Sequence, residues 1–362
     1  MTTPTSKRLL DLLEIDVPII QAPMAGVSSP AMAAAVANAG GLGSVGVGAT
    51  DAAGAGAMIA GIRERTNRSF NVNVFCHQPA RPDEAVEAAW LDRLRPEFER
   101  LGAAPPPILK EIYKSFLADD AMFALLLDQR PPVVSCHFGV PAPDRVRALR
   151  EAGIILLGSA TSPAEARVIA DAGFHAVVAQ GYEAGGHRGL FDPKTEDDRL
   201  GTLALTRLLV RSLDIPVIAA GGIMDGAGIA AALRLGAAAA QLGTAFIGTD
   251  ESLADAFYRA ALASDAAYHT TMTAAISGRP ARSLANRFTR LGAGIDPAAI
   301  PAYPIAYDAG KALNAAGKAA GEPGYGAQWA GQGAPLARAM SAGALMATLI
   351  AELDTALLEA PR

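Results

Sequence analysis

Residues 216–244 have the sequence PVIAAGGIMDGAGIAAALRLGAAAAQLGT, which contains one complete strand–helix–strand unit. Continuous apolar runs at Pro216–Ala220 and Ala238–Leu242 predict two strands that are buried on both faces. Between them, Asp225–Leu235 has the pattern of a helix, and Gly236 ends it because glycine tolerates the left-handed conformation at a helix C-terminus. The unit predicts a parallel sheet whose strands are joined by helices.

The same alternation of apolar runs and Ala-rich helical patterns continues along almost the whole chain of 362 residues. Eight runs predict strands, at Pro18–Ala22, Leu42–Val47, Phe70–Phe75, Pro132–Cys136, Ile154–Gly158, His175–Ala179, Pro216–Ala220 and Ala238–Leu242. Eight parallel strands, each followed by a helix, are the number that closes a barrel. The sequence therefore predicts an α/β protein with a (β/α)8 TIM-barrel fold. A doubly wound open sheet is an alternative that fits the count less well.

The predicted helices have capping residues at their ends. Ser29-Pro30 predicts a helix start, because the serine hydroxyl can accept a backbone N–H and proline needs none at the first helical position. Gly40-Gly41 predicts the end of that helix. Ser162 and Glu165 have the spacing of a capping box before a helix that ends at Gly173. These boundaries indicate strand–helix units joined by short loops.

Two stretches exceed what an eightfold repeat needs. Residues 79–130 lie between the third and fourth runs and predict a helical insertion, and residues 265–345 follow the last run and its helix. Extra length at the ends of barrel strands commonly forms substrate lids. We therefore expect a barrel over 15–264 that includes the insertion, and a C-terminal substrate-lid segment over 265–345 that returns to the barrel. The charged loop Asp192–Arg199 is either a further lid or a solvated loop.

The composition is that of a large soluble protein. Hydrophobic residues make up 51% of the chain, which is ample for a sizeable core, and the net charge of −5 argues against a nucleic-acid partner. Cys76 and Cys136 lack metal-ligand spacing and are interpreted as small buried residues. Met1 to Asp11 lacks the apolar stretch of a signal peptide, and no apolar run is long enough to span a membrane. We expect a cytoplasmic monomer or homodimer.

Glycines and polar residues gather directly after the predicted strands, where barrel enzymes place their active sites. After the seventh run, Gly221-Gly222 offers backbone N–H groups that an anion can approach. After the eighth, Gly243-Thr244 adds further N–H groups and a hydroxyl at the start of a short helix. Glycine loops on these two consecutive strands are the phosphate-binding arrangement of many barrels. The alternative is that the glycines only form tight turns.

Several of these motifs together resemble the nitronate monooxygenase family. They are QAPM at 21–24, Asn73, HFG at 137–139, QGYEAGGH at 180–187, AAGGI at 219–223 and QLGTAF at 241–246. The resemblance extends from about Ile15 to Gly333. It implies a non-covalently bound FMN that is held by Met24, Asn73, Gln180, Gly185, Gly222, Gln241, Leu242, Gly243 and Thr244.

A bound flavin also needs amide groups at its ring edge and an apolar wall beside the ring. Gln21 can supply an amide like those of Asn73 and Gln180, and Pro23 can form a wall with Met24. Ala22 ends the first predicted strand, and Gly221 follows the seventh. These two residues complete the predicted cofactor-binding set. Each residue alone is weak evidence, and their joint position at strand ends is what supports the prediction.

Within the family, the chain is similar to the bacterial class I enzymes. The similarity lies in KEIY at 110–113, YPIAYD at 303–308 and Lys311. It implies a substrate pocket lined by Tyr113, Tyr303, Tyr307 and Lys311, which would suit a nitronate that also carries a carboxylate. The alternative is that Tyr303 and Tyr307, four residues apart, are only one packed face of a helix or turn.

Two histidines are candidate catalytic residues. His187 lies in the loop GGHRG, where a histidine faces a ligand more readily than it fills a core, and His137 follows the fourth predicted strand. His187 can act as a general base on a neutral nitroalkane or as a hydrogen-bond donor to an anionic nitronate. Arg188 is expected to pair with a carboxylate in its own loop. His77, His175 and His269 are interpreted as structural.

The resemblance implies FMN-dependent oxidation of alkyl nitronates by molecular oxygen, giving a carbonyl compound and nitrite. Propionate 3-nitronate is the expected substrate, and no metal is expected. One alternative is an FMN-dependent, NAD(P)H-linked enoyl-acyl-carrier-protein reductase or quinone reductase. Two others are a flavin- or phosphate-binding barrel without catalysis, and a flavin-free isomerase or aldolase. No lysine at a predicted strand end suggests a Schiff base, which makes the last alternative less favourable.

Overall fold

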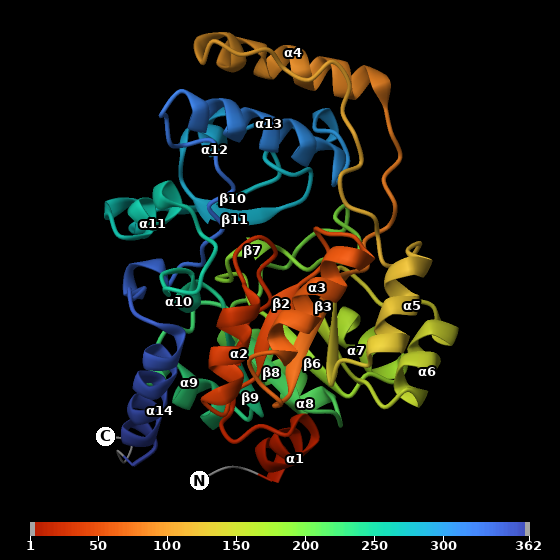
Figure 1. Cartoon of the computed structure of the whole chain (residues 1–362), viewed down its shortest axis with the longest axis vertical. Coiled ribbons are helices and arrows are strands. Elements are labelled where there is room, and N and C mark those ends of the chain that lie inside the picture. Colours follow the sequence, from red (N-terminus) through yellow and green to blue (C-terminus); the bar gives the residue numbers. More distant parts are fainter. Residues whose placement is uncertain (1–3, 359–362) are drawn as a thin grey trace.

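Eight parallel strands form a barrel at the centre of the molecule (Figure 1). The computed structural model describes residues 4–358. The barrel strands are β1 (Ile19–Gln21), β2 (Gly43–Gly46), β3 (Phe70–Phe75), β4 (Val133–His137), β5 (Ile155–Ala160), β6 (Ala176–Gln180), β8 (Val217–Ala220) and β9 (Ala239–Leu242). Their order is β1-β9-β8-β6-β5-β4-β3-β2, and neighbouring strands are parallel.

The barrel closes between the two strands at the ends of that order, β1 and β2. Ile20 and Leu42 form a parallel bridge, in which Gln21 N donates to Leu42 O and Leu42 N donates to Ile19 O, both at 3.0 Å. The predicted (β/α)8 TIM barrel is therefore confirmed, and every predicted strand matches an observed one to within two residues at each end.

One helix packs outside the barrel after each strand. These helices are α2 (Pro30–Asn38), α3 (Ala52–Arg63), α5 (Asp120–Gln129), α6 (Pro143–Glu151), α7 (Pro163–Asp171), α8 (Thr202–Ser212), α9 (Gly226–Arg234) and α14 (Ala342–Leu358). The eighth helix, α14, follows β9 only after the whole lid segment, and it packs against α2 and α9. Among residues 4–358, no helix is long and apolar enough to cross a membrane.

The predicted helix caps are present with one difference. Ser29 Oγ accepts Met32 N at 3.0 Å in front of Pro30, as expected. Ser162 Oγ accepts Glu165 N at 3.3 Å, but Glu165 does not return a bond to Ser162. Its carboxylate instead accepts the N–H and the hydroxyl of Thr161, both at 2.7 Å. The predicted capping box is therefore only half formed, because the Glu165 carboxylate binds Thr161 and not the N–H of Ser162.

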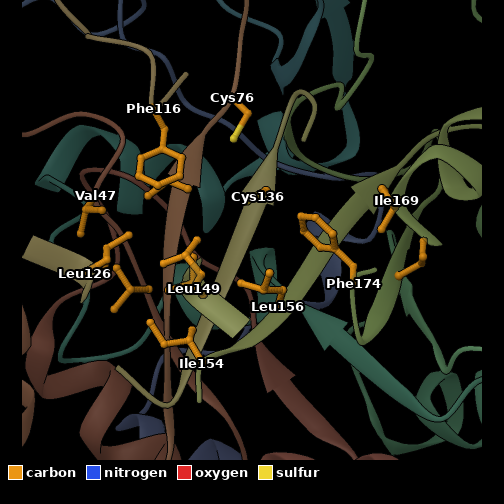
Figure 2. Packing of buried hydrophobic residues seen from close by; sticks show 14 of the residues in the cluster. Val47, Cys76, Phe116, Leu126, Cys136, Leu149, Ile154, Leu156, Ile169 and Phe174 are labelled. Atoms are coloured by element: carbon orange, nitrogen blue, oxygen red, sulfur yellow. The ribbon is translucent and has the colours of Figure 1, made fainter. Parts of the chain in front are cut away.

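The apolar core has layers inside and outside the barrel. Helix α1 (Pro4–Leu13) covers the N-terminal end of the barrel, where its Leu9 and Leu13 pack with interior residues such as Ile20 and Leu157. Figure 2 shows the outer layer between the strands and their helices. Cys76 and Cys136 are free and buried in this layer, as predicted. Because α1 covers one end, a ligand enters at the other.

A lid lies over the C-terminal ends of the strands (Figure 1). A small antiparallel sheet of β10 (Thr270–Thr273), β11 (Ala281–Leu284) and β7 (Gly186–His187) joins it to the barrel. Above this sheet, α4 (Glu84–Arg100) packs against α13 (Ile305–Ala319) through a shared apolar cluster. The remaining short elements are α10 (Thr244–Ile247), α11 (Ala256–Leu262), α12 (Arg287–Leu291) and the 3-10 turns Asp265–Tyr268, Pro297–Ala299 and Ala334–Leu336.

The contact between β2 and α2 provides a test of the barrel packing. In Gly43→Ala, the new Cβ would lie 1.8 Å from the carbonyl oxygen of Ala33, so strand and helix must separate. We expect a loss of about 1–3 kcal/mol or more, measured as a lower thermal unfolding midpoint. Gly343→Ala in α14 is the control, because a Cβ there meets no atom within 4 Å, and its midpoint should hold or rise. Equal midpoints for the two variants would contradict this account.

Candidate active site

A cavity lies between the C-terminal ends of the barrel strands and the lid. Its wall includes most of the residues selected from the sequence, namely Ala22, Pro23, Met24, Asn73, Tyr113, His137, Gln180, Gly185, His187, Gly221, Gly222, Gln241, Gly243, Thr244, Tyr303 and Tyr307. These residues come from six of the eight barrel strands or their loops, and from the lid. The parallel barrel brings them together because all its strands end at the same rim.

Three of the selected residues lie outside this wall. Gln21 is fully buried, where its Oε1 accepts Ser44 N at 2.8 Å and its Nε2 donates to Ser28 Oγ at 2.9 Å. Its amide therefore holds β1 against β2 and is not available at a ring edge. The side chain of Leu242 packs in the apolar layer beneath the loops. Lys311 lines a second cavity that adjoins the first.

One end of the cavity is formed by the glycine loops after β8 and β9. Gly221 and Gly222 have φ values of +129° and +69°, which favour glycine. Within residues 4–358, the backbone N–H groups of Gly222 and Gly243 donate to no acceptor. Thr244 Oγ1 accepts the N–H of Gly331 at 3.0 Å, which ties this end to the lid. Open N–H groups in a glycine cradle fit a phosphate group.

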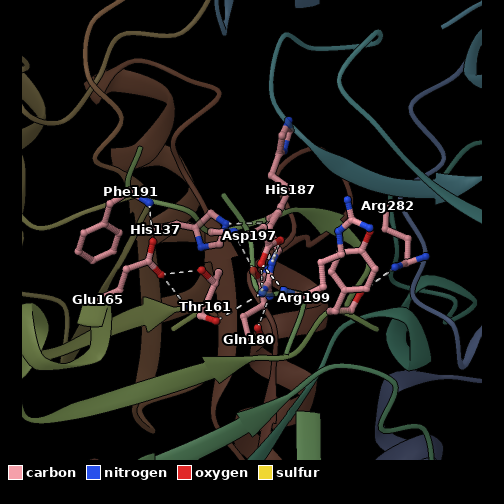
Figure 3. Close-up of polar contacts among 12 residues, drawn as sticks. His137, Thr161, Glu165, Gln180, His187, Phe191, Asp197, Arg199 and Arg282 are labelled. Carbon is pink, nitrogen blue, oxygen red and sulfur yellow. Dashed lines mark hydrogen bonds and ion pairs between the residues drawn. The ribbon is translucent and has the colours of Figure 1, made fainter. Parts of the chain in front are cut away.

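A short hydrogen-bonded network fixes the loop that carries His187 (Figure 3). The carbonyl oxygen of His187 accepts Gln180 Nε2 at 2.9 Å and lies 3.2 Å from His137 Nε2. A carbonyl oxygen only accepts, so His137 carries its proton on Nε2. Gln180 Oε1 accepts the N–H of Gly189 at 2.7 Å, so both ends of this amide are used. The strand β6 thereby holds both sides of the turn that presents His187.

The imidazole of His187 is held by the predicted Tyr303 and by two residues, Ser277 and Trp329, that the sequence did not indicate. Its Nε2 lies 2.9 Å from Ser277 Oγ, and its ring centroid lies 5.1 Å from that of Trp329 and 5.3 Å from that of Tyr303. Trp329 is one of only two tryptophans and stands in a glycine-rich stretch, which was the available signal. Ser277 carried no such signal, because its contact with His187 spans ninety residues.

The ionisable groups around the cavity are held neutral at pH 7. Burial lowers the pKa of His137 to about 4 and that of His187 to about 3. Burial also raises the pKa of Tyr113 and Tyr303 well above their usual range, and that of Tyr307 to about 12. The hydroxyl of Tyr303 has no hydrogen-bond partner among the described residues. This oxygen is buried, and Tyr303 forms part of the cavity wall.

A cation stands at the outer edge of the cavity. Lys311 Nζ lies 4.8 Å from the centroid of the Tyr113 ring and 5.6 Å from that of Tyr307. Tyr113 and Tyr307 line both cavities, so they separate Lys311 from the inner one. The tyrosine rings therefore pack against neighbours and face the cavities at the same time. This mouth offers a positive charge and hydroxyl groups to an entering anion.

The remaining polar residues have the structural positions that were expected. Arg188 is buried and forms a two-pronged ion pair with Asp197, at 2.8 and 2.9 Å. His175 Nδ1 accepts the N–H of Leu156 at 2.9 Å. His77 is fully buried and packs edge-on against Tyr303, with ring centroids 4.9 Å apart. His77 therefore supports the cavity wall from behind.

Comparisons with known proteins agree with this architecture. The family model described as nitronate monooxygenase matches residues 6–352. The chain is 62% identical to a nitronate monooxygenase of Paraburkholderia phytofirmans, over 98% of this chain and 97% of that one. It is 53% identical to a nitronate monooxygenase of Pseudomonas aeruginosa, over 96% and 99% of the two chains.

Solved structures show the same fold. A nitroalkane oxidase from Streptomyces ansochromogenes superimposes with a TM-score of 0.88 at 44% identity, covering 96% of this chain and 98% of that one. FabK from Thermotoga maritima superimposes with a TM-score of 0.74 at 30% identity, covering 98% of both chains.

The neutral histidines of the cavity wall predict a loss of stability in acid. His187 has a pKa of about 3 in the folded chain, against about 6.5 when unfolded. Between these values the unfolded state binds more protons, so stability falls as the pH drops from about 6.5 toward 4. When the pH is lowered from 7 to 5, the thermal unfolding midpoint of the native chain should fall. The midpoint of His187→Asn should fall by about 2–4 °C less over the same pH range. The control is a His269→Asn variant at an exposed site; equal falls in all three proteins would contradict this prediction.

Proposed function

The chain belongs to the nitronate monooxygenase family, and we propose that it uses FMN and molecular oxygen to oxidise alkyl nitronates, above all propionate 3-nitronate. The products would be a carbonyl compound and nitrite. One observation carries the proposal: a single cavity has open backbone N–H groups at one end and the neutral imidazole of His187 beside the unpaired Tyr303 hydroxyl at the other.

The glycine loops fit the phosphate of FMN. We propose that Gly221, Gly222, Gly243 and Thr244 hold it, that Ala22, Pro23 and Met24 wall the ring, and that Asn73, Gln180, Gly185 and Gln241 line its polar edge. Asn73 supports this role, because its Nδ2 is bound to Ser135 while its Oδ1 accepts from no described residue. Gln21 and Leu242 would support the cofactor-binding loops from beneath. When bound, FMN supplies the electron-transfer and oxygen chemistry.

His187 is proposed to donate a hydrogen bond to the nitronate. A pKa of about 3 makes its imidazole a weak base, and a nitronate is already deprotonated, so no proton needs to be removed. Its Nε2 faces Ser277, which leaves Nδ1 for the ligand. A donor Nδ1–H requires Ser277 to donate its one hydroxyl proton to Nε2, at 2.9 Å, and not to the carbonyl oxygen of Arg279, at 3.3 Å. His137 would position His187 through its backbone carbonyl.

The lid is proposed to select substrates by charge. The insertion at 79–130 supplies Tyr113, and the segment 265–345 supplies Tyr303, Tyr307 and Lys311. We expect a nitronate whose other end is a carboxylate to place its nitronate group in the inner cavity beside Tyr303 and its carboxylate toward the Lys311 ammonium at the mouth. The lid also covers the strand ends, which excludes bulk water from the cavity and strengthens these polar contacts.

The proposed reaction is tested by oxygen consumption and nitrite release with propionate 3-nitronate, beside a neutral nitroalkane. His187→Asn should retain its flavin colour while kcat falls about 100-fold, because one donor to the reacting group is lost. Visible absorption verifies that the cofactor is still bound. Unchanged steady-state rates in the variant would remove His187 from the mechanism. Rapid flavin bleaching by NADH or NADPH, without nitronate turnover, would favour a reductase.

The charge at the mouth is tested separately with Lys311→Met, which keeps the aliphatic contact with the two tyrosines. KM for propionate 3-nitronate should rise about tenfold, because a partner for its carboxylate is lost. KM for ethyl nitronate, which has no carboxylate, should change little. Lys110→Met is the control, because Lys110 lies in the insertion that supplies Tyr113 but lines neither cavity. An equal rise for both substrates would show that Lys311 does not recognise the carboxylate.

A further inference from the structure

A buried arginine stands one aromatic ring behind the cavity wall. Arg279 lies in the turn between β10 and β11, is only 3% exposed, and its Cζ lies 4.3 Å from the centroid of the Phe138 ring. The Phe138 ring centroid lies 4.4, 5.7 and 5.5 Å from those of His137, His187 and Tyr303. These three residues line the cavity, whereas Arg279 does not.

The charge of Arg279 is not balanced by a direct partner. It takes part in none of the ion pairs formed within residues 4–358. Its Nη2 donates to the carbonyl oxygens of Leu190 and Phe191, and its Nε has no partner in that part of the chain. Burial lowers its pKa to about 10, so it stays positive at neutral pH. The two carbonyl groups bind its Nη2 without cancelling its charge.

The groups around Arg279 do little to weaken its electrostatic field in the cavity. The histidines and tyrosines on the wall are neutral at pH 7, so they do not offset it. The carboxylates that act on Arg279 are those of Asp192 and Glu165, which lie beyond ion-pair distance. Glu165 already binds Thr161 and the N–H of Phe191. A buried charge in a medium of low dielectric acts over several ångströms.

We propose that Arg279 is a specificity-determining residue, whose positive charge acts across the Phe138 ring to favour an anionic nitronate over the neutral nitroalkane. This inference rests on the proposed function. Arg279 does not line the cavity, so it acts through its electrostatic field. The β10–β11 turn that carries it also contacts residues of the cavity wall. Ser277, two residues earlier in that turn, contacts His187 Nε2 at 2.9 Å. Gly278 packs on the backbone of Pro301 and Tyr303, so the turn also supports the tyrosine.

The chain contains a matched control for this arginine. Arg282 is also 3% exposed and lies on the adjoining strand β11. Its guanidinium likewise donates to a carbonyl oxygen, that of Tyr182, and packs over the Tyr182 ring at 4.9 Å. It does not face the ring of Phe138. Replacing its side chain therefore removes a buried positive charge and its hydrogen bonds, while the backbone pairing of β11 with β7 and the charge behind the cavity remain.

Anion binding can be measured without turnover. Nitrate, a planar oxyanion shaped like the nitronate group, is titrated into the holoenzyme while tryptophan fluorescence is followed, because Trp329 lines the cavity. A unit charge about 10 Å away, at an effective dielectric constant of about 20, changes affinity about tenfold. The nitrate Kd should therefore rise about tenfold in Arg279→Gln, recover in Arg279→Lys, and stay unchanged in Arg282→Gln. Arg279→Met is the second neutral variant if Arg279→Gln fails to fold.

Substrate selectivity gives the second readout. The ratio of kcat/KM for ethyl nitronate to that for nitroethane should fall about tenfold in Arg279→Gln and recover in Arg279→Lys. Equal nitrate affinity in the native chain and Arg279→Gln overturns the inference. So does an equal loss of affinity in Arg279→Gln and Arg282→Gln, which indicates a structural role. A native protein that oxidises neither compound rejects the proposed function, while the nitrate titration still decides the role of Arg279.

Discussion

The pairing of Gly186-His187 with Ala281-Arg282 is the contact on which the site depends. It is only two residues long, yet it joins the loop after β6 to the lid and places His187 against Ser277 and Trp329. On the barrel side, the same loop is held by Gln180 and His137 through a single carbonyl oxygen. The catalytic candidate is thus fixed from both sides, which is what a positioned donor requires.

Sequence patterns predicted the barrel because most of its strands are continuous apolar runs that local composition reveals. They did not predict the β7–β10–β11 sheet, because β7 is two residues long and gains its conformation from a partner almost a hundred residues away. For the site, motifs located the strand-end loops but not the orientation of each side chain. Gln21 illustrates the difference, since its amide faces inward to satisfy Ser44 and Ser28. Lid packing brings Trp329 to the cavity wall and Ser277 to the imidazole of His187, and no local pattern encodes these long-range contacts.

The carboxylates near the cavity form structural hydrogen bonds and ion pairs. Glu183 accepts the N–H and hydroxyl of Thr202 at the start of α8, and Glu165 holds Thr161 and Phe191. Asp255 pairs with Lys318 at 2.6 Å beside the outer cavity. The inner cavity is therefore bordered by neutral groups, with positive charge behind Phe138 and at the mouth. Such a site repels no anion and presents few bases, a combination that suits a substrate which arrives already deprotonated.

A shared barrel does not decide which reaction occurs, because the same strand-end loops can hold a phosphate for many chemistries. What distinguishes this chain is the lid, whose residues come from two segments far apart in the sequence. Tyr113 arrives from the insertion after β3, while Tyr303, Tyr307 and Lys311 arrive from the segment after β9. The packing of α4 on α13 brings these segments together. Substrate choice is thus coupled to lid assembly, since Lys311 and Tyr307 share α13, and a shift of the insertion relative to α13 would move the Tyr113 ring away from Lys311.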